Sequence, residues 1–126
     1  MPTTNRIAYW LLAGLPAAAF LFASSRKLTG NAAMVENFAR FGYPPWFMYF
    51  IGAAELSGAL GLLFGAVVHP ILPRLAAVGL MIIMVGAVVT HVMHDPLVSA
   101  ASAAVLLAML GGFLYVARSA KQVSAA

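Results

Sequence analysis

The chain has 126 residues, of which 63% are hydrophobic and 8% are charged, with seven Lys and Arg against three Asp and Glu. A soluble domain carries about 25% charged residues, and a chain this short could not cover its surface with so few, so lipid must surround most of it. Because cysteine is absent, a disulfide framework, a thiolate metal site and a thiol nucleophile are excluded. The basic residues are scattered, which argues against nucleic acid as a partner.

Four apolar stretches approach the ~20 residues that a membrane-spanning helix needs. They cover residues 7–24, 47–68, 75–92 and 97–116. Lipid leaves no partner for free backbone groups, and the stretches lack the alternating polarity of a β-barrel. The sequence therefore predicts an all-α integral membrane protein, a single transmembrane domain built as a four-helix bundle. Pro16 is expected to kink the first span, and the Arg26-Lys27 pair after it argues against a cleaved signal peptide.

A short amphipathic helix is predicted between the first two spans. Asn31 is suited to cap its start, and Gly42 with the prolines that follow is suited to end it. Its polar face carries Glu36, Asn37 and Arg40, and its apolar face carries Met34, Val35, Phe38 and Phe41. Such a segment is typical of a helix that lies in the membrane interface. Tyr43, Trp46 and Tyr49 follow as an aromatic belt where the second span enters the membrane.

Glu55 is the main candidate for a functional residue, because ionisable groups within spans are rare and costly. It lies about nine residues into the second span, or roughly 13 Å deep at 1.5 Å per residue. An unpaired charge there is unfavourable, so Glu55 is expected to be protonated or paired. Small residues on its helix (Gly52, Gly58, Ala59, Gly61 and Gly65) indicate that it faces another helix. The alternative is a neutral carboxyl that only fixes helix packing.

Two further ionisable residues are expected on the same side of the membrane as the start of the second span. Lys27, next to Arg26, closes the first span and either extends to the headgroups or pairs with Glu55. His91 closes the third span and either contacts headgroups or joins the same site. His94 lies three residues on, but two histidines without thiolates or paired carboxylates are a weak signal for metal or haem. No metal site is predicted.

The distribution of basic residues gives an expected orientation. With four spans, Arg6, Arg74, Arg118 and Lys121 share one side, and Arg26, Lys27 and Arg40 share the other. The positive-inside rule therefore favours cytoplasmic termini.

Several motifs resemble the DoxX-like family of small bacterial membrane proteins. They are Ser-Arg-Lys-Leu-Thr-Gly at residues 25–30, Phe-Gly-Tyr-Pro at residues 41–44, the Glu55-Leu-Ser-Gly run and the closing His91. The resemblance implies a four-helix bundle in the bacterial cytoplasmic (inner) membrane, with Lys27, Glu55 and His91 at the family's polar positions. The family is named for a subunit of a thiosulfate:quinone oxidoreductase, most members have no assigned activity, and no redox centre is visible in this chain.

The resulting hypothesis is a polar pocket that opens toward the outer leaflet. Lys27, Glu55 and His91 are its expected catalytic residues, and Arg26, Tyr43 and Trp46 its expected binding residues, with Tyr43 and Trp46 as a lid. A quinone or another membrane-dissolved metabolite is the expected ligand. The protein would be a membrane subunit of a redox system with a soluble redox partner, or an acid–base enzyme.

Two other classes of function stay open. One is a proton-coupled exporter resembling the small multidrug resistance proteins, although their key acid lies in the first helix and Glu55 lies in the second. The other is a structural or partner-binding subunit without a pocket. The small-residue stripes make a homo-oligomer an expectation in each case.

Overall fold

The computed structural model describes residues 3–125, and the side chains of residues 3–118. Its elements are α1 (Thr3–Leu28), α2 (Ala32–Phe41), α3 (Pro45–Val68), α4 (Leu72–His94), the 3-10 turn η1 (Leu97–Ala100) and α5 (Ala101–Ala125). Four helical segments are long and apolar enough to cross a membrane, namely Thr3–Leu28, Pro45–Val68, Leu72–His94 and Leu97–Arg118. The prediction of an all-α membrane protein with four spans is confirmed.

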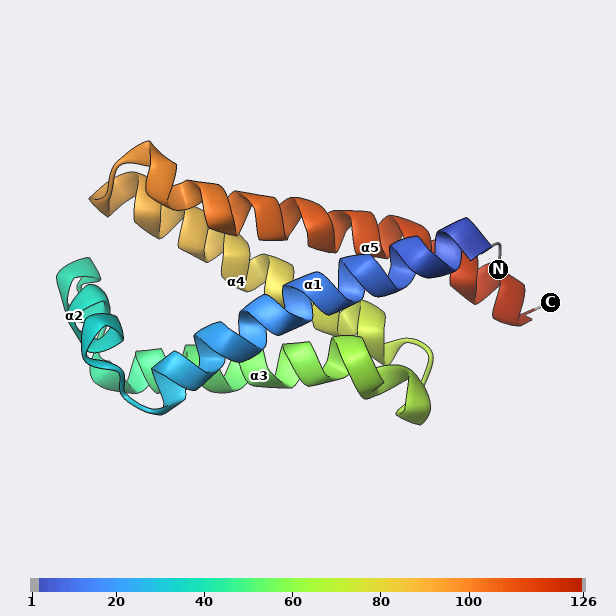
Figure 1. The fold of residues 1–126 in the computed structure, drawn as a ribbon. Helices are drawn as coiled ribbons and strands as arrows, with labels where there is room; N and C mark the ends of the chain where they lie inside the picture. Colours follow the sequence, from blue (N-terminus) through green and yellow to red (C-terminus); the bar gives the residue numbers. More distant parts are fainter. Residues whose placement is uncertain (1–2, 126) are drawn as a thin grey trace.

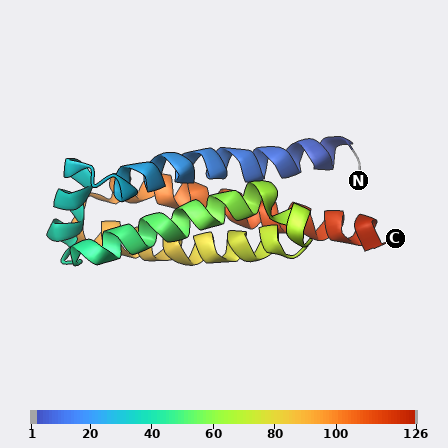
Figure 2. The same cartoon turned by 90° about the horizontal axis from the view of Figure 1, so that it is seen from below.

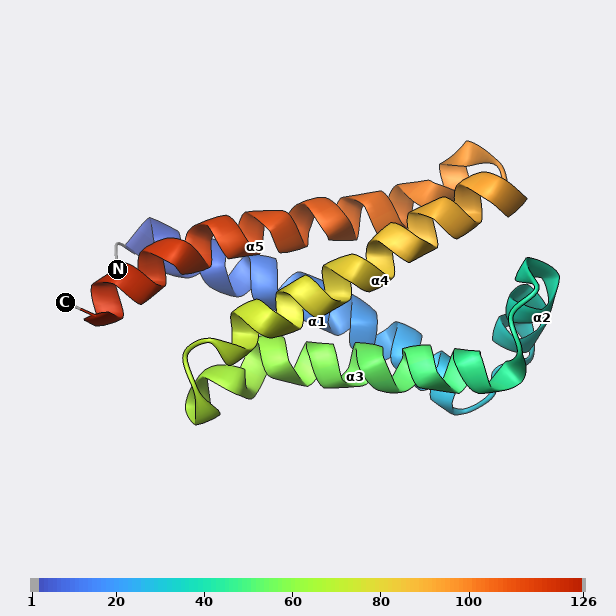
Figure 3. The same ribbon diagram turned by 180° about the vertical axis from the view of Figure 1, so that it is seen from behind.

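The four long helices form an antiparallel bundle in which α1 and α4 each pack against both α3 and α5. The beginning of α1 and the end of α5 lie at one end of the bundle (Figure 1). The short α2 lies across the other end, which the view in Figure 2 also shows. From behind, α4 runs obliquely between the end of α3 and the beginning of α5 (Figure 3).

The hydrophobic core lies between the four long helices. Its fully buried side chains include Ala13, Ala17, Leu62, Ala77, Leu110 and Phe113. Large apolar side chains such as Phe64 and Val67 instead point outward and are 60% and 88% exposed. This arrangement is favourable when the surrounding solvent is hydrocarbon, because lipid tails are as apolar as the side chains they touch.

Glycines bring α3 and α4 into close contact. A Cβ atom at Gly58 would lie 2.6 Å from the Leu80 side chain, and one at Gly61 would lie 2.7 Å from Cβ of Ala76. The small-residue stripe of α3 is therefore used for packing within the chain. It gives no support to the expected homo-oligomer, which would need another surface.

The amphipathic helix forms as predicted, from Ala32 to Phe41. The Asn31 side chain accepts hydrogen bonds from the backbone N–H groups of Ala33 and Met34 at 3.0 and 3.4 Å. Gly42 has φ of +87°, and the N–H of Tyr43 donates to the carbonyl of Phe38 at 2.9 Å. These bonds satisfy free backbone groups at both ends and thereby stabilise this short helix next to the bundle.

The helix boundaries differ from the prediction in two ways that matter for the site. The first span continues through the buried Pro16 to Leu28, so the proline does not end the helix and Lys27 belongs to its last turn. The fourth span begins with a 3-10 turn after Pro96 rather than directly with an α-helix.

Candidate ligand site

Lys27 and Glu55 form an ion pair between α1 and α3. The Lys27 Nζ atom lies 2.9 Å from Oε1 of Glu55, and the two side chains are 12% and 3% exposed. Glu55 therefore faces the bundle, and the predicted contact with Lys27 is present. The pair resolves the cost of placing a carboxylate among apolar helices, because each charge is compensated by the other.

Gly52 explains why the lysine reaches the glutamate. It is buried on α3 about one turn before Glu55. A Cβ atom at this position would lie 3.0 Å from Cβ of Lys27 and 3.1 Å from Cγ of Leu28. The missing side chain lets the end of α1 lie directly on α3, with the lysine stem directed along α3 toward Glu55.

The Glu55 carboxylate has one partner among the described residues. The Lys27 ammonium lies 2.9 Å from Oε1, and no other described side chain donates to this buried oxygen. An ionised carboxylate has about four lone-pair sites and can accept several hydrogen bonds. Glu55, which lines the cavity, therefore has capacity left for an incoming hydrogen-bond donor.

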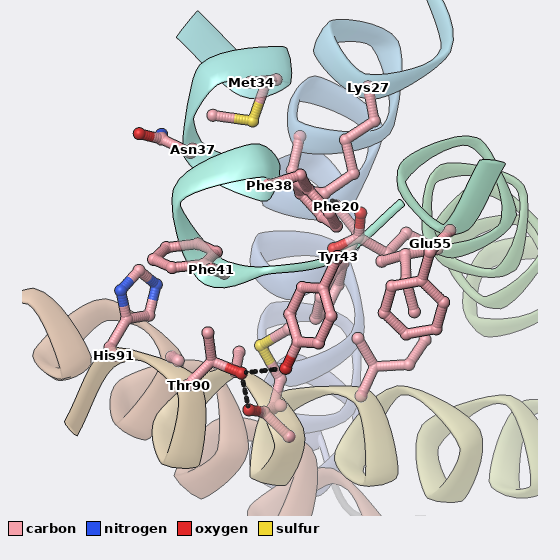
Figure 4. A pocket seen from close by; sticks show the side chains of 18 of the residues that line it. Phe20, Lys27, Met34, Asn37, Phe38, Phe41, Tyr43, Glu55, Thr90 and His91 are labelled. Carbon is pink, nitrogen blue, oxygen red and sulfur yellow. Dashed lines mark hydrogen bonds and ion pairs between the residues drawn. The ribbon is translucent and has the colours of Figure 1, made fainter. Parts of the chain in front are cut away.

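The pair lies in the wall of a cavity of about 510 Å³, which is within the size range of small-molecule sites. Figure 4 shows the cavity between α2 and the helices of the bundle. Most of its wall is apolar and aromatic, contributed by Ala19, Phe20, Ala23, Met34, Phe38, Phe41, Phe47, Phe50, Ile51, Ile82, Ile83, Met84, Gly86, Ala87, Ala103 and Leu106. The polar lining residues are Lys27, Asn37, Tyr43, Glu55, Thr90, His91 and Ser102.

Tyr43 and Thr90 form a second polar position in the wall. The Thr90 hydroxyl donates to the carbonyl of Gly86 at 2.8 Å, and the Tyr43 oxygen lies 2.8 Å from Thr90 Oγ1 (Figure 4). Because the threonine has one proton and it is directed to Gly86, the tyrosine must donate to the threonine. The Tyr43 oxygen then presents lone pairs to a ligand.

His91 lines the cavity but does not join Lys27 and Glu55. It lies on the opposite side of the cavity in Figure 4. Its Nδ1 atom is 2.8 Å from Oδ2 of Asp95, one helical turn further along the chain. The expected cluster of three ionisable residues is therefore replaced by a pair, because His91 has a closer acceptor in Asp95.

Asp95 also connects α2 to the end of α4. Arg40 of α2 donates to its Oδ1 atom at 2.5 Å. Hydrogen bonds from His91 and Arg40 lower the pKa of the Asp95 carboxyl below its ordinary value. Together with the Tyr43–Thr90 hydrogen bond, this contact holds α2 and the following turn over the cavity.

Two of the expected binding residues lie outside the cavity wall. The Arg26 guanidinium lies 5.7 Å from the centre of the Phe22 ring. The Trp46 side chain is 65% exposed and meets the Phe47 ring edge-on. The expected lid of Tyr43 and Trp46 is replaced by Tyr43 and the apolar face of α2, because that face turns onto the bundle.

Sequence reasoning missed the part played by Met34, Phe38 and Phe41, which line the cavity from α2. Their helical spacing is the signal, but the same spacing is typical of any amphipathic helix in the membrane interface and does not indicate a cavity. Thr90 was also missed, and it offered no signal beyond its position next to His91. Among the described residues, no three His, Cys, Asp or Glu side chains come together in a way that could hold a metal ion.

The four long apolar helices of the described residues are those of a multi-pass membrane protein. The model of the DoxX-like family matches residues 11–122, and the chain belongs to this family. No curated protein and no solved structure matches the chain.

Proposed function

We propose that this protein binds a lipophilic small molecule with a polar head inside the bundle. The observation that carries the proposal is the position of the Lys27–Glu55 pair, buried in the wall of an otherwise largely apolar cavity of about 510 Å³. Apolar walls with a few converging polar groups are typical of sites that bind and orient small molecules.

A quinone or another membrane-dissolved metabolite is the proposed occupant. The aromatic walls suit a ring or a chain, and the ion pair suits a polar head. The protein would then serve as a membrane subunit of a redox system, with a soluble redox partner, or as an acid–base enzyme. In the enzyme, Lys27 and Glu55 would exchange a proton with the ligand, and His91 would act from the other side of the cavity.

The cavity favours ligand binding over a structural subunit without a pocket. Five helices contribute to its wall, and two opposite charges lie in this wall among apolar side chains. We propose the bacterial cytoplasmic membrane as its location, with cytoplasmic termini, so that α2 lies at the outer leaflet. Proton-coupled export is the competing proposal, since it too would use Glu55.

Recovery of a co-purifying ligand tests the proposal. The protein is purified in a mild detergent, and its bound small molecules are extracted and compared by mass spectrometry with those of two variants. Ala87→Phe fills the cavity, because Ala87 lines it. Val89→Phe adds the same ring on the same helix at a position that is 52% exposed and does not line the cavity.

We expect one lipophilic compound to accompany the parent protein and the Val89→Phe variant but not the Ala87→Phe variant. The same extract composition from all three folded proteins would contradict ligand binding in the cavity.

A further inference from the structure

The polar groups of the cavity restrict the chemistry of the ligand head. The Glu55 carboxylate lines the cavity, and Lys27 is its one partner among the described residues. A bound molecule with only acceptor atoms would bring its lone pairs toward this carboxylate. A molecule that donates an O–H or N–H would instead form a hydrogen bond to a charged acceptor, which is stronger than a bond between neutral groups.

The lysine adds the complementary requirement. An ammonium group carries three N–H donors and no acceptor. Lys27 directs its charge to Glu55, and no hydrogen bond from it to another described residue is present. At least two of its donors therefore remain for the lone pairs of a ligand atom that lies next to the Glu55 carboxylate.

We infer that the site selects a ligand whose head is a hydroxyl group, which donates to Glu55 and accepts from Lys27 with the same oxygen atom. This inference rests on the proposed function and names its ligand class as phenols, hydroquinones or alcohols with a lipophilic body. A carbonyl or ether head can accept a hydrogen bond from Lys27 but has no hydrogen to donate to Glu55. The reduced form of a quinone therefore fits the site better than the oxidised form.

The rest of the cavity accommodates the lipophilic body of such a ligand. Phe20 and Phe38 line the cavity close to the ion pair in Figure 4. Phe50 and Ile82 line it on α3 and α4 while being 58% and 68% exposed. These two side chains reach both the cavity and the lipid-facing surface, so an alkyl chain could extend past them into lipid.

Three matched probes test the inference on the full-length protein in detergent. 4-Octylphenol donates and accepts, 4-octylanisole only accepts, and 4-octyltoluene has nearly the shape of the phenol but does neither. Equilibrium dissociation constants are measured with each probe expressed as its mole fraction in the micelle, so that differences in partitioning cancel. We expect the phenol to bind about ten- to a hundredfold more tightly than either control, as one hydrogen bond to a charged group implies.

Variants assign the preference to the ion pair. The double variant Lys27→Met with Glu55→Leu removes both charges together, and its phenol preference is expected to fall to about twofold or less while the toluene still binds. Glu55→Gln keeps an acceptor oxygen without the charge, so its preference is expected to lie between those of the parent and the double variant. This second variant decides the matter if the double variant does not fold.

Equal binding of the phenol and the anisole by the parent would overturn the inference, as would a preference that Glu55→Gln leaves unchanged. In either case, binding that Ala87→Phe abolishes and Val89→Phe preserves would still support the proposed function. If none of the probes bound the parent, the proposed function itself would be contradicted for this class of compound.

Discussion

The ammonium of Lys27 lies 2.9 Å from Oε1 of Glu55, in a part of the bundle where the two side chains are 12% and 3% exposed. The two residues are 28 positions apart in the chain and come from different helices. Their contact joins α1 to α3 and at the same time places both charges in the wall of the cavity. Stability and the proposed ligand recognition therefore depend on the same pair.

Removal of one partner should cost more than removal of both. Lys27→Met leaves a buried carboxylate without its counter-charge, so we expect a loss of about 3–5 kcal/mol in the free energy of unfolding. The double variant Lys27→Met with Glu55→Leu should recover most of that loss, because it leaves no unpaired charge. Unfolding in mixed detergent micelles, followed by circular dichroism, gives the free energy of unfolding of each protein in this double-mutant cycle. Losses that simply add would mean that the two side chains do not interact.

The close packing of α3 on α4 gives a test with an internal control. Gly61→Ala places a methyl group 2.7 Å from Cβ of Ala76, an atom held by the backbone of α4. We expect a loss of about 1–3 kcal/mol, as is usual for overpacking. Gly79→Ala on α4 meets nothing within 4 Å, so it should be neutral or slightly stabilising. Equal effects of the two substitutions on the melting temperature would contradict this packing.

Arg40 and Asp95 should limit the opening of α2. Arg40 is 48% exposed, so solvent screens and weakens the pair. Arg40→Gln should therefore speed hydrogen exchange of the α2 amides by up to about fivefold. Glu36→Gln on the same helix is the control, because Glu36 is exposed and forms no ion pair within the described part of the chain. Equal exchange rates in both variants and the parent would show that the contact does not hold α2.

The contact between Arg40 and Asp95 should persist in mildly acidic solution. Hydrogen bonds from His91 and Arg40 lower the pKa of the Asp95 carboxyl. A carboxyl with a lowered pKa in the folded state stabilises that state above its ordinary pKa, and the contribution is lost as the pH falls through the lowered value. Protection of the α2 amides, corrected for intrinsic exchange, should therefore persist down to about pH 4 and decrease below it. Protection lost between neutral pH and pH 5 in the parent, but not in Asp95→Asn, would contradict this assignment.

Cysteine labelling tests the proposed orientation, since the chain has no cysteine of its own. Single cysteines at the exposed positions Thr3 and Glu36 lie at opposite ends of the bundle. In intact cells, a membrane-impermeant reagent should label position 36 and not position 3, and after lysis it should label both. The reverse pattern in intact cells would place α2 in the cytoplasm.

The sequence predicted the number of spans, the extent of α2 and the burial of Glu55, because each depends on local composition and spacing. Apolar length defines a span, Asn31 and Gly42 define the ends of α2, and one acid among small residues must find a partner. Contacts between residues of different elements were harder to predict from the sequence. His91 was expected beside Glu55, but its side chain instead contacts Asp95, one turn further along the chain.

The surface that the apolar face of α2 contacts was not predicted, and the reason is physical. An apolar helical face has the same sequence pattern whether it contacts lipid tails or the open end of a bundle. The choice depends on long-range contacts such as Arg40 to Asp95 and Tyr43 to Thr90, which join residues 55 and 47 positions apart. For the same reason, Trp46 was expected over the cavity although it points away from it.

Ligand binding in the cavity can be observed in a structure of the protein in a lipid nanodisc, prepared without delipidation. We expect non-protein density inside the cavity between α2 and the bundle, with its polar end within hydrogen-bond distance of both Lys27 Nζ and the Glu55 carboxylate. A cavity closed by repacked Phe38 and Phe41 side chains, with Glu55 turned to the lipid and separated from Lys27, would contradict it.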